Sequence, residues 1–502
     1  MTPSRLTKSQ SAKIITNRAA ATNLSLLKRV RSAVSWNISS SLIGQLIAFV
    51  RSVVLARLLA PDDFGLFAMA LTIVAALNAL TTIGLDRTIV ANKFDRPEEL
   101  KAHLDTMWSA ELIRSLVIAL MVLASAFPMS RFYGQPQLTV IIPILGLVSF
   151  VQGFQNIGLV ILRKEITFAR IFWYELATNV SGIALTVVLA VVMRNVWALV
   201  IGLLLTAALG TILSYIFHPH RPHLAFEKTA LSRALSMAKF TLIIAVASYV
   251  TNMADNVMIG RLMGSGALGN YSLAFNIASA PIVILVFSLS TVFFPAYAEI
   301  ISDNPKRLEP AFTKVFSISL VVMLIITVPL FMLSKEIVQL LFGERWTSAG
   351  TVLRVLAIAI PLRGLAQIIS TAFWGLNRPK EVAVGRMLEA VVFLTALYPL
   401  ITAFGLIGAG WAGVIAYAFA CVNRLVALNK IIPGIKSKLL IGSLSTLLAG
   451  GAGLVIASFS LTFITSPLPR VILGGLISLI IPAVIMLLVK ADLRKWIVSW
   501  FS

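Results

Sequence analysis

Long apolar runs recur along almost the whole of this 502-residue chain. Each run is about 20 residues long, the length that an α-helix needs to cross a bilayer, whereas a transmembrane β-barrel would show alternating segments of about 10 residues. We therefore predict an all-α integral membrane protein with about 14 transmembrane helices. The expected spans are residues 36–58, 66–88, 107–127, 138–162, 172–193, 196–217, 237–262, 270–298, 314–333, 350–375, 383–403, 405–428, 438–464 and 469–489.

The charged residues predict how the spans are oriented. Only 12% of the residues are charged, yet the net charge is +22. If the N-terminus lies in the cytoplasm, about 31 of the 42 Lys and Arg residues fall on the cytoplasmic side and about eight on the outer side. This is the bias of the positive-inside rule. It places both termini in the cytoplasm and explains the positive charge without a nucleic-acid partner.

An internal repeat relates the two halves of the chain. Residues 57–73 read RLLAPDDFGLFAMALTI, and residues 261–277 read RLMGSGALGNYSLAFNI, at an offset of 204 without a gap. Six expected spans separate the copies, so both copies have the same orientation and the repeat is parallel. In each copy we expect the helix to break after Arg57 or Arg261, with Gly65 and Gly269 allowing a tight turn into the next span.

The repeat divides the chain into two six-helix bundles with further segments around them. No soluble domain fits into the short loops, and the single cysteine, Cys421, excludes an intramolecular disulfide. The expected units are a basic cytoplasmic tail at 1–35, bundles at 36–217 and 237–430, a cytoplasmic linker at 218–236, and an additional helix pair with a short cytoplasmic tail at 431–502.

Four stretches resemble a known family. They are ARLLAPDDFGLFAMA (56–70), IGLDRTIV (83–90), DNVMIGRLMGSGALGNYSLAFNIASAP (255–281) and VFFPAYAEI (292–300). These stretches are similar to Wzx-type polysaccharide flippases of the multidrug/oligolipid/polysaccharide exporter superfamily, over about residues 36–430. The resemblance implies two bundles around a central cavity and alternating access. It also implies a polyprenyl-diphosphate-linked oligosaccharide as substrate and no covalent chemistry, hence no catalytic residues.

Arg51 and Asp255 are equivalent in the repeat, and both lie two turns before the outer end of their helices. Ionisable residues inside a membrane are functional candidates by default. Three interpretations stay open: the two residues form an ion pair that closes an outer gate, Arg51 binds the diphosphate with Asp255 as its resting counterion, or each pairs within its own bundle. Asn252 and Asn256 share a helical face with Asp255, which favours the cavity side.

Further candidates lie at membrane depth in other spans. Glu111 and Arg114 are an i, i+3 pair that we interpret as local, although a cavity-facing Arg114 would receive the diphosphate at the cytoplasmic entrance. Arg363 lies near the middle of its span, which favours a cavity role. A weaker repeat at an offset of 211 matches VQGFQNI (151–157) with LRGLAQI (362–368), which makes Gln152 the counterpart of Arg363. The amides of Gln152 and Gln367 suit hydrogen bonds to a sugar.

Other ionisable residues have plainer interpretations. Glu175 and Glu389 begin their expected spans, where they are either helix-start acids or coupling sites. All four histidines, His103, His218, His220 and His223, are expected in loops. The spacing of the last three allows weak metal binding, which we do not expect.

The sequence predicts a transporter and not an enzyme. We expect a flippase of the bacterial inner membrane for exopolysaccharide or lipopolysaccharide synthesis, with membrane lipids, a polysaccharide polymerase and export machinery as partners. No cofactor is expected, and coupling to a gradient of an unknown ion stays open. The alternatives are a cation-coupled multidrug antiporter of the same superfamily and a membrane glycosyltransferase or polymerase. The membrane-depth charges, Arg51, Arg114 and Arg363 against Glu111 and Asp255, favour an anionic substrate over a cationic drug.

Overall fold

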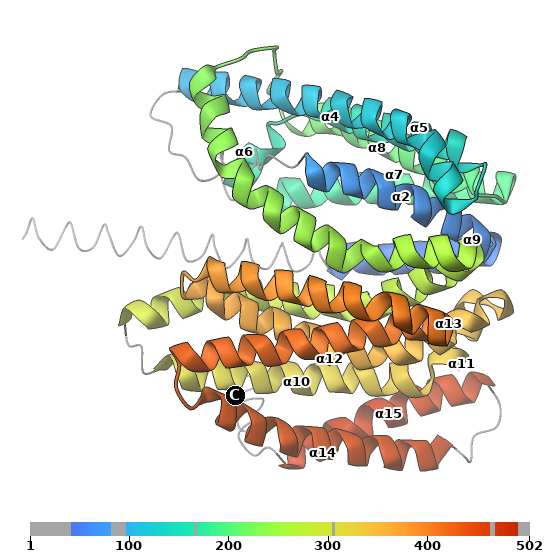
Figure 1. Cartoon of the computed structure of the whole chain (residues 1–502), viewed down its shortest axis with the longest axis vertical. Coiled ribbons are helices and arrows are strands. Elements are labelled where there is room, and N and C mark those ends of the chain that lie inside the picture. Colours follow the sequence, from blue (N-terminus) through green and yellow to red (C-terminus); the bar gives the residue numbers. More distant parts are fainter. Residues whose placement is uncertain (1–41, 82–96, 165–167, 304–306, 462–466, 490–502) are drawn as a thin grey trace, which may run out of the picture.

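A computed structural model describes residues 42–81, 97–164, 168–303, 307–461 and 467–489. Within these ranges the chain is helical and contains no strand. The long helices run side by side along one common direction, which is the arrangement expected of a multi-span membrane protein (Figure 1). The two expected tails, 1–35 and the residues after 489, lie outside the described residues.

The first half of the chain is a set of paired helices. α4 packs against α5, α7 against α8, and α5 against both α8 and α2 (Figure 1). α4 begins well before its apolar run, since polar residues continue the helix beyond the expected membrane boundary. The described helices are 42–58, α2 (Pro61–Leu80), α4 (Pro97–Tyr133), α5 (Leu138–Gly153), α6 (Leu159–Lys164), α7 (Phe168–Met193) and α8 (Trp197–Phe217).

Two long helices of the second half are each bent into two legs. α9 bends at Gly264 with φ 85°, and α13 bends at Gly405 with φ 60°, a conformation that glycine adopts at little cost. With these legs counted, every expected span has a helix among the described residues. The expected span 138–162 is divided into α5 and the short α6, and the short α11 was not predicted. The elements are α9 (Lys228–Asp303), α10 (Leu308–Met332), α11 (Ser334–Phe342), α12 (Thr347–Gly375), α13 (Pro379–Ile431), α14 (Ile435–Leu461) and α15 (Pro467–Val489).

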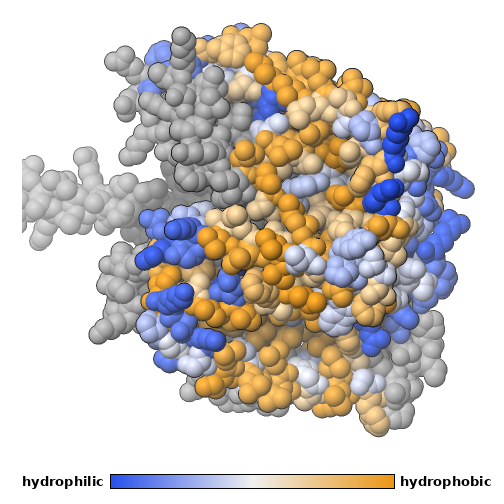
Figure 2. Space-filling view, in the orientation of Figure 1, coloured by the Kyte–Doolittle hydropathy of each residue, from blue (hydrophilic) through white to orange (hydrophobic). Residues whose placement is uncertain are grey.

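The surface has the distribution that a bilayer requires. Figure 2 shows apolar residues across the middle of the visible face, with hydrophilic residues gathered toward its two ends. Among the described residues, eight helices are long and apolar enough to cross a membrane. α14 and α15 pack against each other and against α10, so the additional pair lies on the outside of the second half. The chain is therefore a multi-pass membrane protein.

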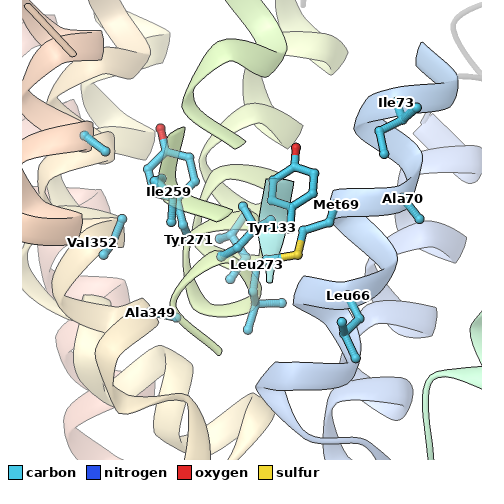
Figure 3. Packing of buried hydrophobic residues seen from close by; sticks show 14 of the residues in the cluster. Leu66, Met69, Ala70, Ile73, Tyr133, Ile259, Tyr271, Leu273, Ala349 and Val352 are labelled. Carbon is cyan, nitrogen blue, oxygen red and sulfur yellow. The ribbon is translucent and has the colours of Figure 1, made fainter. Parts of the chain in front are cut away.

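The two halves meet mainly where α2 packs against α9. Figure 3 shows buried side chains of both halves converging there, with Tyr133 of α4 beside Leu273 and Met69. We call this end of the molecule the hairpin end, because the helix breaks after Arg57 and Arg261 lie there. The opposite end, which holds the loop 218–227, is the linker end.

The repeat glycines have a different role from the one expected. α2 begins at Pro61 and α9 bends at Gly264, so Gly65 and Gly269 lie inside helices and not in turns. A Cβ on Gly65 would lie 1.8 Å from the carbonyl oxygen of Ser265, and a Cβ on Gly269 would lie 1.9 Å from that of Pro61. Because Pro61 and Ser265 are also equivalent in the repeat, these two contacts are symmetric copies of each other.

Candidate functional site

Arg51 lies in the helix 42–58, about 10 Å before its last residue at the usual rise per residue. Its side chain is partly buried. Among the described residues it makes no hydrogen bond and no salt bridge. A charged side chain inside a membrane costs on the order of 3 kcal/mol. Because the guanidinium of Arg51 is partly accessible and has no counterion among the described residues, it is a candidate for binding an anion.

Asp255 is held within its own half of the molecule. Its Oδ2 accepts a 2.8 Å hydrogen bond from the Tyr271 hydroxyl, and its Oδ1 accepts one of 2.8 Å from the backbone N–H of Asn256. The side chain is buried, and no salt bridge joins it to Arg51. This arrangement matches the third interpretation for Asp255 in this conformation and leaves Arg51 outside it.

Arg363 connects three helices of the second half. It donates from Nη1 to Ser279 Oγ at 3.1 Å and from Nη2 to Asn252 Oδ1 at 3.0 Å, both on α9. Its guanidinium also lies over the rings of Phe275 and Tyr417, 5.3 and 5.5 Å from their centres. No described carboxylate lies within salt-bridge distance of it. The structure thus brings the predicted residues Asn252 and Arg363 together, and all direct partners of the arginine among the described residues are neutral.

Glu111 and Arg114 form the local pair that their spacing predicts. Arg114 Nε donates to Glu111 Oε2 at 2.8 Å, and the two side chains also form a salt bridge. Arg114 further lies 3.4 Å from Asn78 Oδ1 and 3.3 Å from Thr81 Oγ1 of α2. The pair is neutral overall and joins α4 to α2.

The remaining predicted residues lie apart from one another. Gln152 is exposed near the end of α5. The side chain of Asn256 donates to the sulfur of Met253 at 3.6 Å, one turn earlier on its own helix. Gln367 is on α12, one turn beyond Arg363, and accepts a hydrogen bond from Arg386. Of these three, only Gln367 joins a polar cluster inside the second half.

That cluster contains charges that sequence reasoning assigned elsewhere. Glu389 is not at the start of its helix but in the third turn of α13, where it is buried. It forms salt bridges with Arg424 at 2.6 Å and with Arg386 at 3.3 Å. The i, i+3 spacing of Arg386 and Glu389 could have indicated their salt bridge. No local sequence pattern indicates the salt bridge with Arg424, because Arg424 lies on the second leg of α13.

At the hairpin end the two halves are joined by polar contacts. Ser265 Oγ donates to Asp62 Oδ1 at 2.7 Å, and the indole of Trp346 donates to the carbonyl of Ala56 at 2.9 Å. Arg57 donates to the carbonyls of Leu340 and Leu341 in α11. Together with the glycine contacts these bonds close the molecule at this end. These contacts of Arg57 were not predicted from the sequence, because α11 was not predicted.

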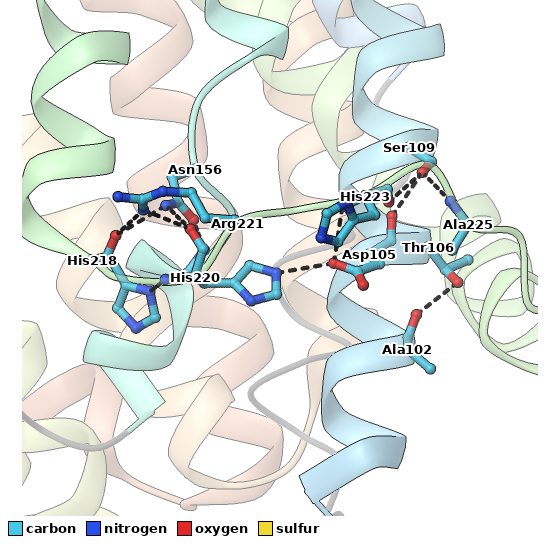
Figure 4. A network of polar contacts seen from close by, with 11 residues as sticks. Ala102, Asp105, Thr106, Ser109, Asn156, His218, His220, Arg221, His223 and Ala225 are labelled. Atoms are coloured by element: carbon cyan, nitrogen blue, oxygen red, sulfur yellow. Dashed lines mark hydrogen bonds and ion pairs between the residues drawn. The ribbon is translucent and has the colours of Figure 1, made fainter.

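At the linker end the loop between the halves is bound to α4 and to the turn between α5 and α6 (Figure 4). His220 Nε2 lies 3.0 Å from Asp105 Oδ1, and Asn156 donates to the carbonyls of His218 and His220. Burial lowers the pKa of His220, and the neighbouring Asp105 partly opposes this shift. Among the described residues no three His, Cys, Asp or Glu side chains gather as metal ligands would.

Comparison with known proteins shows which family the chain belongs to and which solved structures share its fold. The profile of a family described as "Polysaccharide biosynthesis protein" matches residues 54–351, more than half of the chain. The chain belongs to this family. Curated relatives named as transport or lipopolysaccharide proteins are similar to it over most of their length, and the solved structure of a flippase shares the fold.

Two curated relatives and one solved structure illustrate the similarity. The succinoglycan biosynthesis transport protein ExoT of Rhizobium meliloti is 26% identical over 408 residues, 76% of this chain and 80% of its own. The lipopolysaccharide biosynthesis protein WzxC of Escherichia coli is 26% identical over 350 residues, 69% and 70% of the two chains. The lipid II flippase MurJ, in an inward closed conformation, has a TM-score of 0.76 at 14% identity and covers 92% of this chain and 100% of its own.

Proposed function

We propose that this polysaccharide biosynthesis protein moves a polyprenyl-diphosphate-linked oligosaccharide repeat unit across the bacterial inner membrane. The product serves exopolysaccharide or lipopolysaccharide synthesis, and both termini lie in the cytoplasm. A polysaccharide polymerase with its export machinery receives the unit on the outer side. The names of ExoT and WzxC as polysaccharide transport and biosynthesis proteins support this proposal, as does the shared fold of a lipid II flippase.

The observation that carries the proposal is a pair of arginines at membrane depth that form no salt bridge among the described residues. Arg51 has no described partner, and Arg363 is held only by neutral groups. A guanidinium binds phosphate oxygens in bidentate geometry, so each site gains when a diphosphate supplies the missing charge. A cationic drug would meet repulsion at the same places. The arginines therefore favour an anionic lipid substrate over the cargo of a multidrug antiporter.

Alternating access would act on the contacts between the halves. The hairpin end is closed here by Asp62 with Ser265 and by the symmetric glycine contacts. Release of the unit on that side requires these contacts to separate. Asp255 stays with Tyr271 in the closed form, so we propose Arg51 primarily as a diphosphate site. A gate pair of Arg51 with Asp255 would have to form in another state of the cycle.

The proposal is tested by exopolysaccharide export in a strain that lacks the endogenous gene. Arg51→Ala and Arg363→Ala should each lower export while membrane insertion, followed on immunoblots of the membrane fraction, stays normal. Arg345→Ala is a matched control, because Arg345 is an exposed arginine at the hairpin end and is not one of the candidate site residues. Full export by both variants, or complementation failure by the wild-type chain, would refute the proposal. A change only in drug susceptibility would assign the chain to the antiporters.

A further inference from the structure

Three helix segments of the second half share one polar cluster. Arg424 on the second leg of α13 donates to Glu389 on the first leg, and Arg386 bonds both Glu389 and Gln367 of α12. Arg424 and Glu389 are each 1% exposed, whereas the Arg386 side chain is 28% exposed. The cluster therefore consists of a sealed ion pair and one accessible cation beside it.

The accessible side of Arg386 is turned inward and not toward lipid. Arg386 is in line, at helical spacing, with Glu389, Phe393 and Leu397, which are buried against the rest of the second half. The opposite face of the same leg is apolar and exposed, as Met387 and Val391 show. Because a charge that faces hydrocarbon is costly, partial exposure on the packed face indicates access to water inside the molecule.

The charges of the cluster do not cancel. Glu389 carries one negative charge, which Arg424 holds at 2.6 Å, closer than the 3.3 Å to Arg386. Arg424 also packs across Gly385, where a Cβ would lie 3.3 Å from its Nε. One positive charge is left over, and it resides on the guanidinium with access to water. No other described carboxylate forms a salt bridge with Arg386.

Gln367 connects this cation to the candidate site. It is one helical turn from Arg363 on α12, about 6 Å along the axis toward the linker end. We propose that Arg386 and Gln367 form an anion-binding subsite for a diphosphate group, and that Arg424 keeps the subsite cationic by holding Glu389. This inference rests on the proposed function and extends it. The diphosphate meets Arg386 first when it arrives from the linker end and passes to Arg363 afterwards.

Binding of inorganic pyrophosphate to the purified full chain tests the subsite. In phosphatidylcholine nanodiscs, followed by titration calorimetry, Arg386→Ala should raise the Kd about tenfold, the effect of losing one charge-assisted hydrogen bond. Arg386→Lys should restore part of the affinity. The control is Arg378→Ala, which removes an exposed arginine one residue before the same helix. An unchanged Kd in Arg386→Ala, or no pyrophosphate binding by the wild type, would overturn the subsite.

A second set of variants tests the role of Arg424. In Arg424→Met, Glu389 keeps only Arg386 as its salt-bridge partner and neutralises it. Pyrophosphate binding should therefore weaken nearly as much as in Arg386→Ala. Adding Glu389→Gln should restore binding, although it removes a second charged residue. Neutralising both partners also relieves an unpaired buried charge, so the deciding variant adds Arg386→Ala to the double variant. The recovered binding should then be lost, whereas a purely structural role predicts that it stays. If Arg424→Met does not fold, the double variant with and without Arg386→Ala still decides: binding that is equal in both would overturn the proposal.

Lipid headgroups are a second source of phosphate, and a further arm separates them. Nanodiscs with phosphatidylglycerol should leave the Kd for pyrophosphate within about twofold, since the subsite is inside the protein. Strong competition by phosphatidylglycerol would assign Arg386 to lipid headgroups and overturn the diphosphate subsite. Export in cells reports separately on the proposed function, so normal export with no effect of Arg386→Ala on pyrophosphate binding would remove the subsite alone.

Discussion

At the scale of single residues, the charges inside the membrane fall into two groups. Glu111 with Arg114 and Glu389 with Arg424 are paired at close range and hold helices together. Arg51 lacks a described counterion. The paired charges join helices, whereas Arg51, like Arg363, forms no salt bridge among the described residues and is available to a ligand. The spacing of Glu111 and Arg114 predicts their pairing, but the pairing of Glu389 with Arg424 follows only from the packing of the two legs of α13.

The rate of export should depend on the bidentate geometry of the Arg51 guanidinium as well as on its charge. Arg51→Ala removes a charge-assisted contact to the substrate, worth about 1.5–3 kcal/mol, and should slow export about 10- to 100-fold. Arg51→Lys keeps the charge but not the bidentate fork, so an intermediate rate is expected. The rate of polymer appearance in the medium, normalised to protein in the membrane, is the measurement. Equal rates for all three proteins would contradict a diphosphate contact.

Arg424 should matter for stability as well as for charge. Removing one partner of a buried ion pair costs about 3–5 kcal/mol, whereas replacing both partners by neutral residues of similar size is often nearly neutral. We expect Arg424→Met to lower the melting temperature in detergent clearly, and Arg424→Met with Glu389→Gln to recover most of the loss. A double variant less stable than the single one would show that the pair itself stabilises the fold.

The candidate site could be predicted from the sequence only in part. The repeat gave Arg51 and Asp255 as equivalent positions, and the mid-span location of Arg363 indicated its importance. Arg386 was not among the predicted site residues, because a lone basic residue near an expected loop resembles any other. Its true neighbours, Gln367 and Glu389, come from packing between α12 and the two legs of α13. Such contacts have no sequence period.

At the scale of elements, the repeat encodes a contact between helices. The lengths of the apolar runs predict the spans and their order. They do not predict that Gly65 and Gly269 lie inside α2 and α9, because a glycine after a helix break equally suits a turn. What the sequence could not show is the partner: each glycine faces the backbone of the other copy. The short helix α11, whose apolar run is below spanning length, was also missed.

The glycine contact should control closure of the hairpin end. Gly65→Ala places a Cβ 1.8 Å from a backbone oxygen, so the two helices must move apart even though alanine favours a helix. In a Cys421→Ser background, a cysteine introduced by Ser265→Cys should react faster with an impermeant maleimide once Gly65→Ala is present. The control is Gly44→Ala, where nothing lies within 4 Å of the new Cβ. Unchanged labelling with Gly65→Ala would contradict the closure.

The linker contact should depend on pH. Burial lowers the pKa of His220 below its ordinary value of about 6.5, with Asp105 opposing the shift and Lys101 and His223 adding to it. The released linker then binds more protons than the attached one, so attachment is favoured above about pH 6.5 and weakens as the pH falls below it. Hydrogen exchange of residues 218–227 should quicken at acidic pH. His220→Gln should remove most of this dependence, and a slope unchanged by that substitution would rule out His220.

At the scale of the whole molecule, two similar halves meet at α2 and α9 and are tied again by the linker. The hairpin end is closed by contacts that are individually small, and no covalent bond joins the halves there. Such an interface can separate while each half keeps its own core. This is the property that a carrier needs if it is to expose one site to the two sides of a membrane in turn.

The side of the membrane on which the lipid-linked repeat unit accumulates tests the central claim most directly. In a strain without this gene, a membrane-impermeant reagent that labels the sugar should reach little of the unit from outside intact cells. Labelling should return with the wild-type chain and stay low with Arg51→Ala. Full labelling from outside in the absence of the protein would contradict a flippase, because the unit would then cross the membrane without it.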